Sequence, residues 1–184
     1  MSLSRAVTVG LFSVALAMAA RAADSKPEVV KFGKLSATAP AEWKSEKPAN
    51  RLRSNQFKVL SGMEGVPDAE VYVMPDSDPN PDKSFPRWKA SFVPPDGKTI
   101  DDIAKVTKFE IPGAKVQVLD ITGTWKFKER PFDPKSKEEL RPEYRVVWVI
   151  VETKDEAAHL RISGPAAVVD KHYPAFEKWI KSAK

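Results

Sequence analysis

Four oxygen-bearing side chains follow one another at every second position between a predicted strand and a predicted helix. They are Asp76, Asp78, Asn80 and Asp82, and this spacing is that of the first half of a calcium-binding loop. The second half departs from the pattern, because Pro81 stands where the sharp turn needs glycine and Arg87 stands where a bidentate glutamate is needed. The sequence therefore predicts no EF-hand and leaves two interpretations, a weak irregular calcium site and a solvated loop.

Motifs for nucleophilic, phosphate-binding or metal chemistry are missing from the sequence. The chain has no cysteine and only two histidines, His159 and His172, and neither lies in a metal-binding or nucleophile motif. It contains no G-x-S-x-G elbow, no P-loop and no G-x-G-x-x-G fingerprint. We therefore expect no cofactor and no structural metal, and we assign no catalytic residue.

Asp120 is the acidic residue with the most unusual surroundings, because it interrupts the apolar run VQVLDITG. It either faces water or is paired under the sheet, with Arg145 or Arg161 as the available arginines. A hydrolase-type enzyme would need a second carboxylate beside it, for instance Glu152, and only the fold could bring the two together.

The segment 126–145 mixes seven basic with five acidic side chains and carries three prolines. One interpretation is an extended, solvated connection between strands. The other is a surface that contacts an anionic or mixed-charge partner, for which Lys135, Lys137 and Arg141 are the candidate residues.

The five tryptophans divide into two groups. Four of them occupy positions where a core needs bulk: Trp88, Trp125, Trp148 and Trp179. Trp43 follows Pro40 on a predicted turn and is free to be exposed, so it is the aromatic residue that a small-ligand carrier would use.

Hydrophobic patterning predicts an α+β fold with an antiparallel sheet, an N-terminal hairpin, a short middle helix and a C-terminal helix. The middle helix is capped by Ser84, presents Phe85, Trp88 and Phe92 on one face and ends at Pro94. The C-terminal helix begins near Pro165. Strands are predicted at 29–32, 35–39, 55–60, 69–74, 104–111, 115–127, 144–151 and 158–163.

Residues 1–23 have the features of a cleavable secretory signal, with a basic start at Arg5, an apolar stretch and a small-x-small site at 20–22. The apolar stretch is shorter than a helix that spans a membrane needs to be, so we expect no stable membrane insertion after cleavage. Residues 24–184 then form one domain in the periplasm or outside the cell. Basic and acidic residues are mixed without a basic stripe, which argues against nucleic-acid binding.

Several longer stretches resemble small uncharacterised exported bacterial proteins with a PsbP-like fold. The matching stretches are PAEW at 40–43, RWKASFVPPDG at 87–97, VLDITGTW at 118–125, YRVVWVIVET at 144–153 and SGPAAVVDKHYPAFEKWIKS at 163–182. The loop before the middle helix differs, because it is rich in Asp and Pro where those proteins are rich in glycine. The resemblance implies an α/β/α sandwich and, since proteins with this fold are mostly accessory or binding proteins, a binding role.

The sequence thus favours an exported, non-catalytic binding or accessory protein that contacts an envelope protein or component. A small-ligand carrier and an enzyme whose carboxylates meet only in the fold are the alternatives.

Overall fold

The computed structural model describes residues 28–76, 79–130 and 133–184. The expected signal segment, residues 1–23, lies outside them. The elements are, in order, β1 (Val29–Phe32), β2 (Leu35–Thr38), β3 (Lys44–Glu46), β4 (Asn55–Val59), β5 (Ala69–Asp76), α1 (Pro81–Lys89), β6 (Phe92–Val93), η1 (Ile100–Asp102), β7 (Ala104–Ile111), β8 (Ala114–Lys128), β9 (Glu138–Glu152), β10 (Ala157–Pro165) and α2 (Ala166–Lys181).

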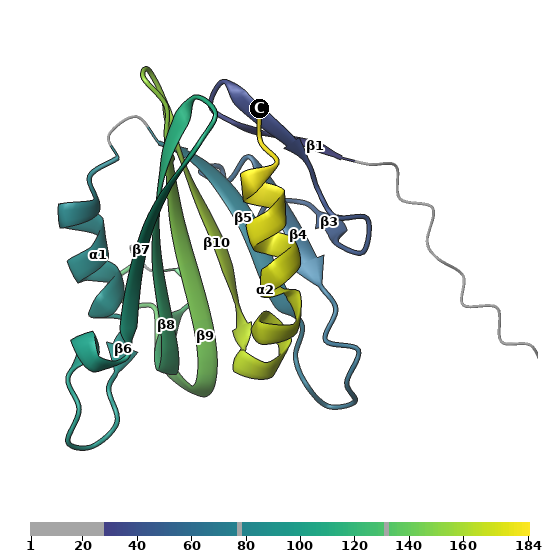
Figure 1. Cartoon of the computed structure of the whole chain (residues 1–184). Coiled ribbons are helices and arrows are strands. Elements are labelled where there is room, and N and C mark those ends of the chain that lie inside the picture. The colour runs from purple at the N-terminus through teal and green to yellow at the C-terminus, as the bar shows by residue number, and fades with distance from the viewer. Residues whose placement is uncertain (1–27, 77–78, 131–132) are drawn as a thin grey trace, which may run out of the picture.

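The fold is α+β, and the predicted layout is confirmed. Strands β1 and β2 form a separate hairpin, and the other strands form one antiparallel sheet of eight strands with the order β3-β4-β5-β10-β9-β8-β6, in which β7 also pairs with β8. Figure 1 shows α2 in front of β4, β5 and β10, with the C-terminus beside the β1–β2 hairpin. Backbone hydrogen bonds in both directions between Ser36 and Lys184 tie the end of the chain to that hairpin.

The larger core lies between the sheet and α2, and the strands supply it with every second side chain. Val147, Val149 and Val151 of β9 point into it, as do Leu160 and Ile162 of β10. From α2 come Phe176 and Trp179, which the rings of Phe32, Trp43 and Phe57 surround. Aromatic side chains from the N-terminal and C-terminal parts of the described chain therefore pack together in one core.

The smaller core lies on the opposite face of the sheet, under α1. The intervening residues of β9, Val146, Trp148 and Ile150, belong to it. Trp88 of α1 stacks on Trp148 with the ring centroids 5.5 Å apart and the ring planes 6° from parallel. Both faces of β9 are thus covered, as expected for the unbroken apolar run of this strand.

The middle helix differs from the sequence prediction at both ends. Asn80, not Ser84, is its N-cap, because the Asn80 side chain accepts a hydrogen bond from the backbone N–H of Lys83. The helix ends at Lys89, and Phe92 belongs to β6. Phe85 and Phe92 still enter the same core, since β6 pairs with β8 at Trp125 and so brings Phe92 back over the sheet.

Two further differences concern strands. The short strand β3 was not predicted, because Lys44–Glu46 is polar and lies at the edge of the sheet. Most of the segment 126–145 is strand, since β8 continues to Lys128 and β9 begins at Glu138. The C-terminal helix begins after Pro165 as expected and is not split by Pro174.

No helix in the described ranges is long and apolar enough to cross a membrane.

Candidate functional site

The described members of the possible calcium loop have separate structural tasks. Asp76 lies 2.8 Å from Nε2 of His159, Asn80 caps α1, and Asp82 lies in the first turn of that helix. Asp78 lies outside the described residues. Within the described ranges, no group of three His, Asp or Glu side chains could hold a metal ion.

The two histidines lie on different faces of the sheet. His159 is buried beside Trp88, with the ring centroids 5.3 Å apart, and burial lowers the pKa of its imidazole below the ordinary value. His172 of α2 lies 3.1 Å from the carbonyl oxygen of Leu60. Side chains alternate along β10, since Leu160 and Ile162 face the α2 side and His159 and Arg161 the other.

Asp120 is paired with Arg145, one of the two arginines named from the sequence. Arg145 donates from Nε and Nη2 to the two carboxylate oxygens at 3.0 and 2.6 Å, and from Nη1 to Asp170 of α2 at 2.8 Å. The bonds to Asp120 raise the already high pKa of the guanidinium. Glu152 is not part of this group: it lies opposite Lys115 and Asp120 opposite Val147, which places the two carboxylates about 17 Å apart along the strands.

The expectation of an exposed Trp43 is wrong. Only 3% of the residue is accessible, and its ring packs 5.1 Å from that of Trp179 and 5.8 Å from that of Phe57. The turn places the backbone at the surface but directs the indole inward under α2. Trp43 is therefore a core residue and offers no surface to a ligand.

The three basic residues proposed to contact a partner do not share one environment. Lys135 and Lys137 are exposed on the β8–β9 loop. Arg141 lies within β9, where it bonds to Glu139 at 3.0 and 3.1 Å, and its guanidinium carbon lies 3.5 Å from the ring centroid of Phe127. Arg141 therefore belongs to the sheet face, whereas the two lysines lie on the loop that precedes β9.

The sheet face opposite α2 changes character from one side to the other. The strand register places one row of residues directly opposite one another across this face: Gln56, Tyr72, Arg161, Trp148, Leu119 and Val106. Trp148 and Leu119 lie in the core under α1. Toward Arg161, Tyr72 and Gln56 the row becomes polar, and no helix among the described residues packs on that part of the face.

Arginines and aromatic rings alternate on this polar part and its border, and we call the set the arginine–aromatic belt. The guanidinium carbons of Arg53 and Arg161 lie 4.3 and 4.4 Å from the centroid of Tyr72, and Arg161 also lies 5.2 Å from Trp125. Trp125 contacts Phe127 and Tyr144, whose rings Arg141 approaches in turn. The belt consists of Arg53, Tyr72, Trp125, Phe127, Arg141, Tyr144 and Arg161, of which Trp125 is buried, with 6% accessible, and joins the two halves of the belt from the smaller core.

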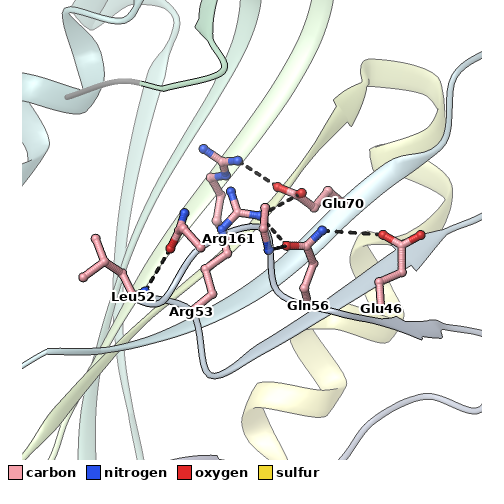
Figure 2. A network of polar contacts seen from close by, with 8 residues as sticks. Glu46, Leu52, Arg53, Gln56, Glu70 and Arg161 are labelled. Carbon is pink, nitrogen blue, oxygen red and sulfur yellow. Dashed lines mark hydrogen bonds and ion pairs between the residues drawn. The ribbon is translucent and has the colours of Figure 1, made fainter. Parts of the chain in front are cut away.

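A single carboxylate bridges the two arginines beside Tyr72 (Figure 2). Glu70 accepts from Arg53 at 2.9 Å with one oxygen and from Arg161 at 3.0 Å with the other. Arg53 also donates to Gln56 at 2.7 Å, and the backbone N–H of Ala49 donates to the same amide oxygen. The network thus fastens the β3–β4 loop to the strands.

The charges of this network do not cancel. Two guanidiniums share the one carboxylate of Glu70, and the side chain of Glu70 is one third accessible. Nε of Arg161 is buried and has no hydrogen-bond partner. Buried donors are almost always paired in native proteins, so this N–H is an exception within the network.

A shallow pocket lies away from the belt, at the tips of two hairpins. Its volume is about 410 Å³, and its lining combines opposite charges from Glu110, Lys115, Glu152 and Lys154. It contains no buried unpaired group and lacks the convergent polar atoms of a ligand site.

Sequence reasoning did not find the belt as a site. Its members come from five separate segments, and only strand register places them on one face. A weak signal exists in the alternation of EVYV and HLRIS, where a polar side chain occupies each position that faces away from α2.

Comparisons with known proteins give little beyond the fold. No family model matches the chain, and no curated protein matches it. A crystal structure of a protein of unknown function, PA94 from Pseudomonas aeruginosa, is similar at 14% sequence identity over 86% of this chain and 96% of that chain, with a TM-score of 0.44. This similarity carries no argument about function, and the resemblance to PsbP-like proteins stays a prediction.

Proposed function

We propose that this chain is an exported, non-catalytic binding protein and that a protein partner docks on the arginine–aromatic belt. The observation that carries the proposal is the continuous alternation of guanidiniums and aromatic rings on the part of the sheet that no described helix covers.

The residue types of the belt are those that dominate binding energies at protein interfaces. Tryptophan, tyrosine and arginine are enriched at such hot spots because they combine a large apolar area with a directed polar group. Packing of a guanidinium against a ring leaves its N–H groups, which lie in the guanidinium's own plane, able to donate to an acceptor. The belt side chains are therefore ordered before a partner arrives, which lowers the entropic cost of binding.

The charge of the belt favours an acidic partner. Its three arginines face two carboxylates, Glu70 and Glu139, to which they are already bonded. The hydrogen bonds from Arg141 lower the pKa of Glu139, so that carboxylate is ionised and the pair is neutral. The remaining positive charge lies at Arg53 and Arg161. Lys135 and Lys137, on the loop beside the belt, would add to the attraction at the rim and speed association.

Export is proposed from the sequence of residues 1–23. The test is to produce the full chain in a bacterial host, fractionate the cells and measure the N-terminus of the protein by mass spectrometry. We expect processing after Ala22 or Ala23 and recovery outside the cytoplasm. An intact N-terminus in the cytoplasmic fraction contradicts export and leaves the belt proposal untouched.

Docking is tested by photocrosslinking in cells of the organism that makes the protein. A photoreactive amino acid replaces Lys58, which is exposed on the belt side of β4, or Lys178, which is exposed on α2 on the opposite face. We expect a discrete adduct from position 58 and none from position 178, and we expect Arg141→Ala to abolish it. Equal labelling from both positions, or an adduct that Arg141→Ala leaves unchanged, contradicts the proposal.

A further inference from the structure

We infer that Glu70 occupies the place of a partner's carboxylate: an Asp or Glu side chain of an acidic protein segment binds Arg53 and Arg161 in competition with it. This inference rests on the proposed function, since it names the chemistry of the partner at the belt.

The first argument is hydrogen-bonding capacity. A guanidinium has five N–H donors and holds a carboxylate best through two parallel bonds. Arg161 makes one such bond to Glu70, from Nη2, and its Nε is buried without a partner. Arg145, on the opposite face, uses all three of its nitrogens, with two bonds to Asp120 and a third to Asp170. Arg161 therefore keeps capacity for a second oxygen.

The second argument is charge. Arg53 and Arg161 carry two positive charges, and Glu70 supplies one negative charge. The network thus keeps one positive charge even with Glu70 in place, and this charge attracts an acidic segment. The geometry of Glu70 also shows that the space between the two guanidiniums fits a planar carboxylate, with one oxygen directed at each arginine.

The third argument is access. Glu70 is the most accessible member of the network, with 33% of its side chain exposed, against 15% for Arg53 and 13% for Arg161. Its carboxylate can leave toward solvent, while stacking on Tyr72 keeps both guanidiniums in place. Glu70 thus occupies the space between the two guanidiniums until a ligand displaces it, and it competes with that ligand.

The test measures binding of a fluorescein-labelled oligoglutamate peptide to the purified protein by fluorescence anisotropy at low salt. Glu70→Gln keeps the shape of the side chain and removes its charge, so we expect the peptide to bind about tenfold more tightly than to the unsubstituted protein. Glu110→Gln is the matched control, because it makes the same change of charge on exposed β7. Equal gains from both substitutions would show only general electrostatics and overturn the inference.

A second measurement needs no substitution at Glu70. In the unsubstituted protein, the NMR signal of the Arg161 side-chain Nε–H, assigned by its loss in Arg161→Lys, should move when the oligoglutamate peptide is added. A signal that stays in place at saturating peptide contradicts the inference, as does tighter binding of a phosphoserine peptide of equal length. If oligoglutamate fails while the crosslink from position 58 persists, the carboxylate chemistry is wrong and the docking face stands. If both fail, the proposed function is wrong.

Discussion

Asp120 of β8 and Arg145 of β9 are diagonal neighbours across the two strands, and the guanidinium holds both oxygens of the carboxylate, at 3.0 and 2.6 Å. The pair is largely removed from water, with 17% and 15% of the side chains accessible. Because Arg145 also bonds to Asp170 and stacks on Tyr173, it links the sheet to α2. The acid that interrupts the apolar run is thus a structural clamp.

Asp120→Asn should lower the free energy of unfolding by about 3 kcal/mol, since it leaves a poorly paired guanidinium in a largely buried place. Asp170→Asn is the control: that carboxylate is 62% exposed, and its loss should cost no more than about 1 kcal/mol. Urea denaturation of both variants checks the difference. Equal and small losses would show that Asp120 is not the main partner of Arg145.

Trp43→Ala should destabilise the protein by about 3–5 kcal/mol, as truncations of large buried aromatic residues do. Leu52, which is 55% exposed on the β3–β4 loop, provides the comparison, and Leu52→Ala should change stability by no more than about 0.5 kcal/mol. Thermal and chemical denaturation measure both. A stable Trp43→Ala variant would return this tryptophan to the list of ligand-contacting candidates.

Gly164→Ala should lower the stability of the protein more than Gly65→Ala, although of the two glycines only Gly65 has a positive φ. A Cβ at Gly164 would lie 2.7 Å from Cβ and 2.9 Å from Cα of Ala69 on the neighbouring strand, so the backbone must shift, at a cost of about 1–3 kcal/mol. A Cβ at Gly65, where φ is +72°, meets nothing within 4 Å. There the cost is conformational and should be about 1 kcal/mol. The denaturation midpoints of the two variants are compared. A lower midpoint for Gly164→Ala confirms the prediction, and a lower midpoint for Gly65→Ala contradicts it.

His159 should make the protein less stable in acid. Burial, aided by Arg87 and opposed by Asp76, lowers the pKa of the folded-state imidazole, whereas the unfolded chain titrates near its ordinary value of about 6.5. The unfolded state therefore binds more protons as the pH falls below that value, and stability is lost. The loss between about pH 7.5 and pH 5.5 should be smaller in His159→Gln than in the unsubstituted protein. His172→Gln, which removes an imidazole from the opposite face, is the control, and an equal effect of both substitutions contradicts the prediction.

Local patterns predicted most elements of this fold. The unbroken apolar run of β9, the alternation in β10 and the Pro112–Gly113 turn between β7 and β8 each fix one element without reference to the others. The errors fall where a local rule had two solutions. Ser84 and Asn80 are both good helix caps, and the choice of Asn80 adds a first turn that begins with Pro81. Trp43 follows a turn, and a turn does not determine which way its side chain points.

The candidate site depends on information that no single segment contains. Arg161 and Tyr72 lie opposite each other only because β10 pairs with β5 in one particular register. A shift of one residue would exchange the two faces and bury Arg161 under α2. Residue spacing along the sequence therefore could not identify the belt. For Asp120 the sequence could narrow a buried partner to Arg145 or Arg161, and only the register selects Arg145.

The pairing of β5 with β10 also has a consequence for how fast the chain folds. These two strands are central to the sheet, yet Glu70 and Ser163 are distant in sequence. The stretch of chain between these strands must close into a loop before their pairing can stabilise the fold, and the closure costs conformational entropy. Proteins with such high contact order fold slowly. The β7–β8–β9 meander, which needs only local turns, is the expected nucleus, and β3, β4 and β5 join it afterwards. If the chain is exported as proposed, slow closure of the sheet would give a secretion machinery time to engage it while it is still unfolded.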